Sequence, residues 1–203
     1  MEGHGLRAIP AQERSRRTLS AILDAASELL KEGGPDALTT SALAERTGLR
    51  VRNVYRYFRD RQAIVATLAE RMNGRIEAAI ADTAGLSNPD RPLEGMLDDV
   101  IDRVMAAADE EPAATQIRAA MRTSHELQEI DAASDRRIAG LLAEALRQRG
   151  VRVRRGRLEV GLFVLVTSIG AVLDRAALRD EGDGATLIRE LKRLVHAYVA
   201  TLT

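Results

Sequence analysis

Arginine and tyrosine side chains gather in one short stretch of the chain, residues 46–61. The stretch also contains Asn53 and a single acid, Asp60, so its local net charge is +5. Its six arginines stand at positions 46, 50, 52, 56, 59 and 61. Arginine can bind guanine with two hydrogen bonds, asparagine can bind adenine in the same way, and tyrosine can donate a hydrogen bond to a phosphate. These residue types predict a surface that binds double-stranded DNA.

Two short helices joined by a glycine turn are predicted to position these side chains. Apolar residues at helical spacing precede and follow Thr47-Gly48: Ala42, Leu43 and Ala44, then Val51, Val54 and Phe58. Gly48 can adopt the left-handed conformation that ends a helix sharply. Thr39 or Thr40 is placed to cap the first short helix, where a phosphate oxygen can also bond. The arrangement predicts a helix-turn-helix.

A second interpretation of the same stretch is a solvated basic face on a small helical hairpin, because charge runs usually mean only exposure. We favour DNA binding, since the turn, the caps, the tyrosines and the charge all agree on one geometry.

Composition narrows the class of protein further. The 203 residues are 45% hydrophobic and 30% charged, with a net charge of +0, which is a globular balance. Residues 1–61 hold eleven basic against eight acidic residues, and the remainder holds nineteen against twenty-two. Cysteine is absent, which excludes disulfides and thiolate chemistry and fits a reducing cytoplasm. The most apolar run, residues 160–173, is shorter than the roughly 20 residues of a membrane span. We expect a soluble, cytoplasmic protein.

Nearly every segment has a helical pattern, so the fold class is predicted to be all-α, with nine helices. Residues 1–12 form an arm without periodicity. Residues 13–61 form a three-helix, helix-turn-helix DNA-binding domain, whose first helix is stopped by Gly33-Gly34-Pro35. Residues 62–203 form a six-helix ligand-binding and dimerisation domain.

With these elements placed, residues 15–65 resemble the head of the TetR/AcrR family of transcriptional regulators. The resemblance runs through Ile22-Leu23, Leu38-Thr39-Thr40, Gly48-Leu49, Val54-Tyr55-x-Tyr57-Phe58 and Arg61-Gln62. The body shows no comparable motif, as the divergent ligand domains of that family imply.

The resemblance implies roles for single residues. Thr40 contacts a phosphate, Tyr55 and Tyr57 contact the DNA backbone, and Arg61 keeps the phosphate-binding charge of a family lysine. The predicted DNA contacts are Thr39, Thr40, Ser41, Arg50, Val51, Arg52, Asn53, Tyr55, Arg56, Tyr57 and Arg61. Arg50 and Arg52 depart from the family pattern. Arg50 stands where a helix-capping residue is common in the family, and Arg52 stands where glycine or proline is common. Together these arginines favour a half-site that contains guanine.

A nearly all-apolar helix around residues 160–170 must be covered on several sides, by its own chain alone or by a second copy as well. The resemblance implies that the last two helices form a four-helix dimer interface, with two recognition helices about 34 to 36 Å apart. The predicted interface residues are Leu158, Leu162, Leu165, Ile169, Leu191, Leu194, Val195 and Tyr198. The alternative is a helix buried entirely within one chain.

Methionines and other apolar residues of the body are candidates for the lining of an effector cavity. They are Met96, Val100, Val104, Met105, Ile117, Met121, Leu141, Phe163 and Thr167, with His125 as a polar contact. Each is alternatively ordinary core, and His125 a solvent-facing or capping residue. Aromatic residues make up only 2% of the chain, which favours a small apolar effector.

No catalytic site, metal site or cofactor is predicted, because three scattered histidines and no phosphate loop leave nothing to assemble. We therefore expect a homodimeric repressor that binds a pseudo-palindromic operator and is released by an effector. The alternatives are an effector-independent DNA binder, an activator, or a helical small-molecule carrier with an inactive head.

Overall fold

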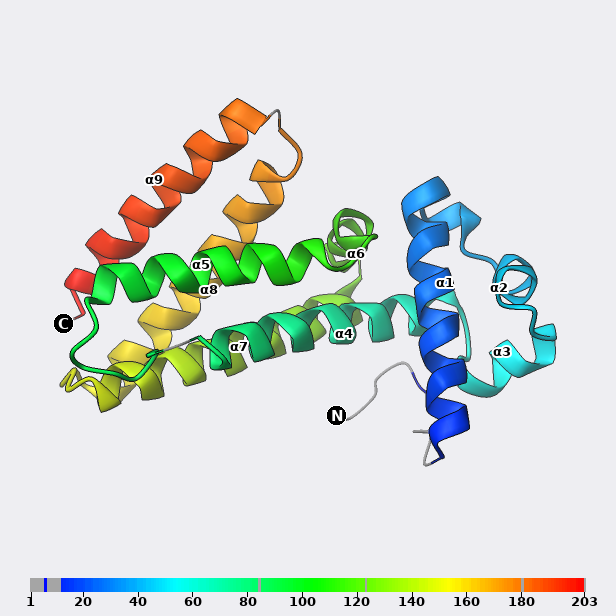
Figure 1. Cartoon of the computed structure of the whole chain (residues 1–203), viewed down its shortest axis with the longest axis horizontal. Helices are drawn as coiled ribbons and strands as arrows, with labels where there is room; N and C mark the ends of the chain where they lie inside the picture. Colours follow the sequence, from blue (N-terminus) through cyan, green and yellow to red (C-terminus); the bar gives the residue numbers. More distant parts are fainter. Residues whose placement is uncertain (1–5, 7–11, 84, 123, 180, 203) are drawn as a thin grey trace. The chain divides into compact units, whose positions relative to one another are not determined.

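The computed structural model of the chain describes residues 6, 12–83, 85–122, 124–179 and 181–202 (Figure 1). Within these residues the chain forms nine α-helices, which confirms the all-α prediction. The helices are α1 (Glu13–Ala37), α2 (Thr40–Thr47), α3 (Val51–Tyr57), α4 (Arg61–Ala81), α5 (Leu93–Asp109), α6 (Ala114–Met121), α7 (His125–Gln148), α8 (Arg155–Ala176) and α9 (Glu181–Ala200).

Helix α1 supplies the scaffold of the predicted helix-turn-helix domain. Ile22, Ala26 and Leu30 recur at steps of four and are fully buried, so this stripe faces the core. The regular helix is interrupted at Gly33 and Gly34, and Gly34 has a φ of 66° that only glycine adopts readily. The first helix is therefore interrupted at the glycine pair that was predicted to stop it. The arm predicted over residues 1–12 lies outside the described residues, apart from Leu6 and Gln12.

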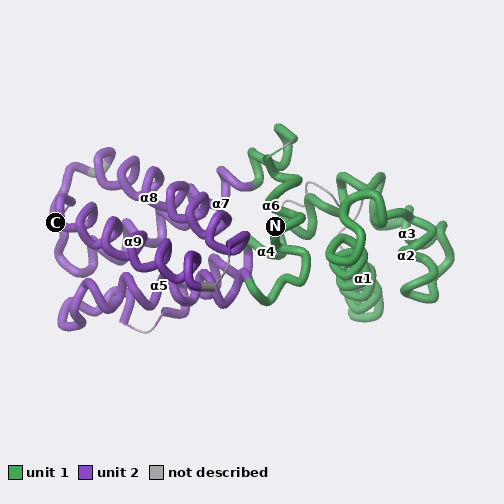
Figure 2. The backbone as a smooth tube through the Cα atoms, turned by 90° about the horizontal axis from the view of Figure 1, so that it is seen from above, with its two compact units in different colours: residues 1–73, 109–130 green, residues 74–108, 131–203 purple. Residues whose placement is uncertain are grey.

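The chain folds into two compact units (Figure 2). Unit 1 contains residues 1–73 and 109–130, and unit 2 contains residues 74–108 and 131–203. This division differs from the predicted domain boundary at residues 61 and 62. Unit 1 takes in the first part of α4, where Ile64, Leu68 and Met72 are buried, and the whole of α6, which packs against α1. The apolar stripe of α4 therefore belongs in part to the core of unit 1.

The core of unit 2 is built around α8 and α9, which lie side by side in opposite directions (Figure 1). Gly161 permits their close approach, because a Cβ atom there would lie 2.8 Å from the hydroxyl oxygen of Tyr198. Polar contacts join α5 to α9 at the edge of this core: an ion pair between Lys192 and Asp102 at 2.7 Å, and a hydrogen bond between His196 and Asp98 at 2.9 Å.

Five of the eight residues predicted for the dimer interface lie instead in this core. Leu158, Leu162, Leu165, Leu191 and Val195 are at most 4% exposed within the single chain. A side chain that its own chain already covers has almost no surface left to bury against a second chain. The prediction that these five form the interface is therefore wrong. Ile169 and Tyr198 are half-buried, and Leu194 is exposed.

A different face of the same two helices carries exposed apolar side chains. Val160 is 64% exposed, Val164 is 53% exposed, and Leu194 on α9 is 55% exposed. Val160 and Val164 lie one turn apart on α8 and so share one face. These exposed apolar residues, Val160 and Val164 on α8 and Leu194 on α9, are together called the α8–α9 face below.

Residues Gly156–Ala176 form a helix that is long and apolar enough to cross a membrane, judged by length and composition alone. The helix is longer than the apolar run that the sequence suggested. Leu158, Leu162 and Leu165 on this helix are buried in the core of unit 2, as expected for the central helix of a globular unit.

Candidate nucleic-acid interface

The turn between α2 and α3 has the predicted conformation. Gly48 is left-handed, with φ 67° and ψ 16°, and its N–H donates to the carbonyl of Glu45 at 3.3 Å. The N–H of Leu49 donates to the carbonyl of Ala44 at 3.0 Å, so the last carbonyl groups of α2 are satisfied. At the other end of α2, the N–H of Ala42 donates to the hydroxyl of Thr39 at 3.1 Å. Thr39 is therefore the capping residue.

Arg50 begins α3 without capping it by a side-chain hydrogen bond. Thr47 does not replace that cap, because its hydroxyl donates to the carbonyl of Leu43 at 2.6 Å. The first turn of α3 is closed only by the backbone, through the N–H of Asn53 and the carbonyl of Arg50 at 2.8 Å. Arg50 is exposed, and its guanidinium does not cap the helix.

Helix α3 has one buried and one exposed face. Val54 and Tyr57, with Phe58 directly after the helix, are buried in unit 1. Val51 and Tyr55 are 39% and 46% exposed, and Asn53 is half-buried. Arg50, Arg52 and Arg56 are exposed. The exposed face of α3 therefore carries residue types that are able to contact bases in a DNA groove.

The six arginines fall into two groups. Arg46 donates two hydrogen bonds to Glu32, at 3.0 and 2.7 Å, and these bonds lower the pKa of Glu32. Arg59 donates to Asp60 at 2.8 Å, and Arg61 donates to the carbonyl of Pro35 at 2.8 Å. These three arginines therefore stabilise the local fold in addition to carrying charge.

The second group is Arg50, Arg52 and Arg56. Within the described part of the chain, none of them forms an ion pair or a side-chain hydrogen bond. The guanidinium of Arg56 lies 6.0 Å from the centre of the Tyr57 ring. An exposed guanidinium without an internal acid keeps its five donors available for a base edge or a phosphate.

Asp60 has a separate structural role at the start of α4. Its carboxylate accepts from the N–H of Ala63 at 2.8 Å, as an N-cap does. This backbone hydrogen bond, together with the bond from Arg59, lowers the pKa of Asp60. The only acid in the basic stretch is therefore tied to the helix and to one arginine.

Thr40 and Tyr55 bring α2 and α3 together at the exposed surface. The hydroxyl of Thr40 lies 3.5 Å from the hydroxyl of Tyr55. Two hydroxyl groups at this spacing can donate to a single phosphate group. The roles that the resemblance implies for these two residues are thus compatible with one shared contact.

Tyr57 does not fit its predicted role. The residue is only 7% exposed, and its hydroxyl lies 3.5 Å from the carbonyl oxygen of Ser15 on α1. A ring that is covered by its own unit offers little surface to DNA. The prediction that Tyr57 contacts the DNA backbone is therefore corrected: Tyr57 packs α3 against α1. The motif signal could not separate it from Tyr55, because both tyrosines stand in one short run.

The residues predicted to line an effector cavity are divided between the two units. Ile117 and Met121 are buried in unit 1, whereas Met96 and Val100 are buried in the core of unit 2. Val104, Met105 and Phe163 are partly buried against that second core. The other three residues, His125, Leu141 and Thr167, are exposed. The lining of an effector cavity by these residues stays a prediction.

A helical unit with a capped α2, a left-handed glycine turn and an outward arginine face on α3 defines a helix-turn-helix DNA-binding protein. Comparison with known proteins extends this assignment. Residues 22–68 match the family described as bacterial regulatory proteins, tetR family, and residues 92–198 match the tetracyclin repressor-like C-terminal domain. The chain belongs to the TetR family of transcriptional regulators.

Individual relatives agree with this assignment. Over 53 residues the chain is 43% identical to the tetracycline repressor protein class A from transposon 1721 of Escherichia coli, a match that spans 26% of this chain and 24% of that repressor. A TetR-family regulator from Streptomyces coelicolor is 25% identical, with a TM-score of 0.70, and the match covers 91% of this chain and 99% of that one. A Mesorhizobium loti structure described as a putative TetR-family regulator, 23% identical, has a TM-score of 0.69, with 94% and 98% covered.

Proposed function

We propose that this regulator is a homodimeric repressor of the cytoplasm, which binds a pseudo-palindromic operator and is released by a small effector. The observation that carries the proposal is the exposed face of α3, where Arg50, Arg52 and Arg56 have no internal acid among the described residues. Arginine is the commonest reader of guanine, so the half-site is proposed to contain guanine.

The α8–α9 face supports the dimer. Val160, Val164 and Leu194 are each more than half exposed, and a Cβ atom added at Gly170 on α8 would meet open space. Exposed apolar patches of this kind mark interaction sites, and most soluble oligomers are twofold symmetric. A twofold axis would present two α3 helices to successive turns of one DNA groove, about 34 to 36 Å apart.

The effector is proposed to bind within unit 2 and to be small and apolar. Val104, Met105 and Phe163 lie partly buried beside the core there, and methionine adapts to irregular ligands. Its binding would act on DNA affinity through α4, whose first part belongs to unit 1 and whose last part belongs to unit 2. The effector must prefer the released state by about 5.5 kcal/mol for a nearly complete switch.

Duplex binding tests the proposal directly. The protein should bind DNA from upstream of its own gene with a steep salt dependence, because phosphate contacts release counterions. A double variant, Arg52→Ala with Tyr55→Ala, should lose both specific binding and much of that salt slope. Selection from random duplexes should return inverted repeats that contain guanine.

Two outcomes would overturn parts of the proposal. No saturable binding to any duplex would indicate a small-molecule carrier with an inactive head. Binding that no candidate effector weakens, together with transcription that rises when the protein is added, would indicate an activator.

A further inference from the structure

Unit 1 is connected to unit 2 at three places along the chain. The chain leaves unit 1 after residue 73 within α4, returns at residue 109 at the end of α5, and leaves again after residue 130 within α7. Residues 109–130, called the α6 segment here, therefore continue into unit 2 at both ends. If this segment were not fastened to the rest of unit 1, only α4 would connect the helix-turn-helix to the remaining chain.

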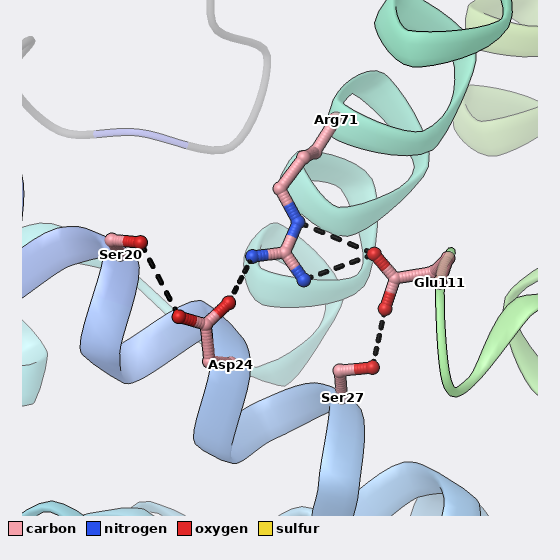
Figure 3. Close-up of polar contacts among 5 residues, drawn as sticks. All are labelled: Ser20, Asp24, Ser27, Arg71 and Glu111. Carbon is pink, nitrogen blue, oxygen red and sulfur yellow. Dashed lines mark hydrogen bonds and ion pairs between the residues drawn. The ribbon is translucent and has the colours of Figure 1, made fainter. Parts of the chain in front are cut away.

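A buried carboxylate fastens the start of the α6 segment. The side chain of Glu111 has no solvent exposure. One of its oxygens accepts from Arg71 on α4, at 2.9 Å from Nη2 and 3.3 Å from Nε, and the other accepts from the hydroxyl of Ser27 on α1 (Figure 3). Three elements far apart in sequence thus meet at a single side chain.

Arg71 extends this contact to a second position on α1. Its Nη1 donates to Asp24 at 2.6 Å, and the hydroxyl of Ser20 donates to the other oxygen of Asp24 at 3.3 Å (Figure 3). Only 19% of the Arg71 side chain is exposed. A buried carboxylate is costly without its cation, so Glu111 holds Arg71 and the two helices in one arrangement.

The remainder of the α6 segment is held by apolar burial and by exposed hydrogen bonds. Ile117 and Met121 are buried in unit 1, and α6 packs against α1. At the far end, Gln62 on α4 donates to the hydroxyl of Ser124 at 3.0 Å and to Glu126 at 3.1 Å. Gln62 and Glu126 are exposed, so water competes for these bonds. At Glu111, by contrast, one buried side chain joins the segment to both α1 and α4, so a single substitution changes both contacts.

We propose that Glu111 is a positioning residue for operator binding. Glu111 fastens the α6 segment to α1 and α4. The DNA-binding unit is then connected to unit 2 by three stretches of chain instead of by α4 alone. A dimer that must place two recognition helices on one operator gains affinity when each is held in place beforehand. The inference rests on the proposed dimeric function.

The test compares a full inverted-repeat operator with a single half-site. If Glu111→Gln reduces the correctly placed population to about one tenth, full-operator affinity falls about tenfold, while half-site affinity stays within about twofold. Binding to a half-site needs one recognition helix only. A change that affects only how the two recognition helices are placed therefore leaves half-site affinity unchanged. Hydrogen exchange of the amides of α6 should become faster in the same variant.

Matched variants separate positioning from simple destabilisation. Glu32→Gln removes an exposed pair between α1 and α2, away from the α6 segment, and should leave the ratio of the two affinities unchanged. Arg71→Gln removes the cation that faces Glu111 on α4, so it should shift the ratio in the same direction as Glu111→Gln. Ser27→Ala removes one bond to Glu111 without leaving a charge unpaired. Ser27→Ala should shift the ratio of the two affinities less than Glu111→Gln does. It replaces Glu111→Gln in the test if that variant does not fold.

Three outcomes would count against the proposal. An equal loss of affinity for the full operator and for the half-site would mean that Glu111 only stabilises unit 1. Unchanged hydrogen exchange in α6 would mean that Glu111 does not fasten the segment. If the unaltered protein shows no preference for the full operator, the dimeric function itself fails, and the role of Glu111 in operator binding fails with it.

Discussion

The hydroxyl groups of Thr40 and Tyr55 lie 3.5 Å apart, although the two residues belong to different helices and are fifteen positions apart in the chain. Thr40 is the first residue of α2, and Tyr55 is on the exposed side of α3. The left-handed turn at Gly48 directs the chain so that these side chains meet. We expect the pair to bind one phosphate of the operator, beside the bases that α3 reads.

Tyr55→Phe should weaken operator binding without disturbing the fold. The change removes one hydroxyl and keeps the ring, so a lost bond to a phosphate of about 1.5 kcal/mol lowers affinity roughly tenfold. The loss should be similar for all duplex sequences, because phosphate contacts carry no base information. Fluorescence anisotropy with labelled duplexes measures it. Tyr57→Phe is the control, since the hydroxyl of the buried Tyr57 lies near the carbonyl of Ser15 on α1, and an equal loss there would contradict the assignment.

Arg52→Ala should relax the choice of base more than Arg59→Ala does. Arg52 has no ion pair among the described residues, whereas Arg59 is bonded to Asp60 at 2.8 Å. A lost bidentate contact to guanine removes about 1 to 3 kcal/mol of discrimination at one position of the half-site. Competition between operators with single base changes measures this loss. Specificity that survives Arg52→Ala intact would exclude Arg52 as a base reader.

Gly48→Ala should destabilise the protein, and Gly74→Ala should not. Gly48 has a φ of 67°, where a Cβ atom costs about 1 to 2 kcal/mol. Gly74 lies inside α4 with open space around it, so alanine there should stabilise by up to about 1 kcal/mol. Urea unfolding, followed by circular dichroism, gives both values. A neutral Gly48→Ala would mean that the turn tolerates another conformation.

Val164→Asp should convert a dimer into monomers while the fold of each chain persists. Val164 is 53% exposed, so the new charge meets water in a single chain and is buried only in a dimer. Analytical ultracentrifugation measures the mass. Leu178→Asp, at a 64% exposed residue outside α8 and α9, is the matched control. If Val164→Asp stays dimeric, the interface lies elsewhere on the chain.

The carboxylate of Asp135 should make stability fall as pH rises. Burial raises the pKa of Asp135, although the hydrogen bond from Thr167, at 2.7 Å, acts in the opposite direction. The folded protein therefore holds this proton at pH values where the unfolded chain has released it. That preference stabilises the fold below the raised pKa and is lost above it. Asp135→Asn should raise the melting temperature more at neutral than at mildly acidic pH, as calorimetry would show. An equal shift at both would refute this assignment.

Much of the DNA-binding end could be predicted from the sequence, because its determinants are local. Gly48 ends α2, Thr39 caps it, and Gly33 and Gly34 interrupt α1, each through interactions within a few residues along the chain. The apolar spacing on α3 likewise placed Arg50 and Arg52 on the exposed face. Backbone conformation and helical periodicity act over short distances, so a single sequence carries them.

The same local signals could not separate residues that differ only in what lies next to them. Tyr55 and Tyr57 stand two positions apart, yet one is exposed and the other is packed against α1. Leu162 and Val164 are equally apolar, yet one belongs to the core of unit 2 and the other to the α8–α9 face. Burial depends on which helix covers a given side, and periodicity does not contain that information.

The sequence by itself therefore determined the helices, the glycine turn and the basic character of α3. Only the tertiary structure decided which arginines remain available for DNA, which face of α8 remains open, and that α6 belongs with the DNA-binding unit. The contact of Glu111 with Arg71 and Ser27 shows the physical reason. Its partners lie 40 and 84 positions away along the chain, and the energy of a buried charge is set by neighbours in space.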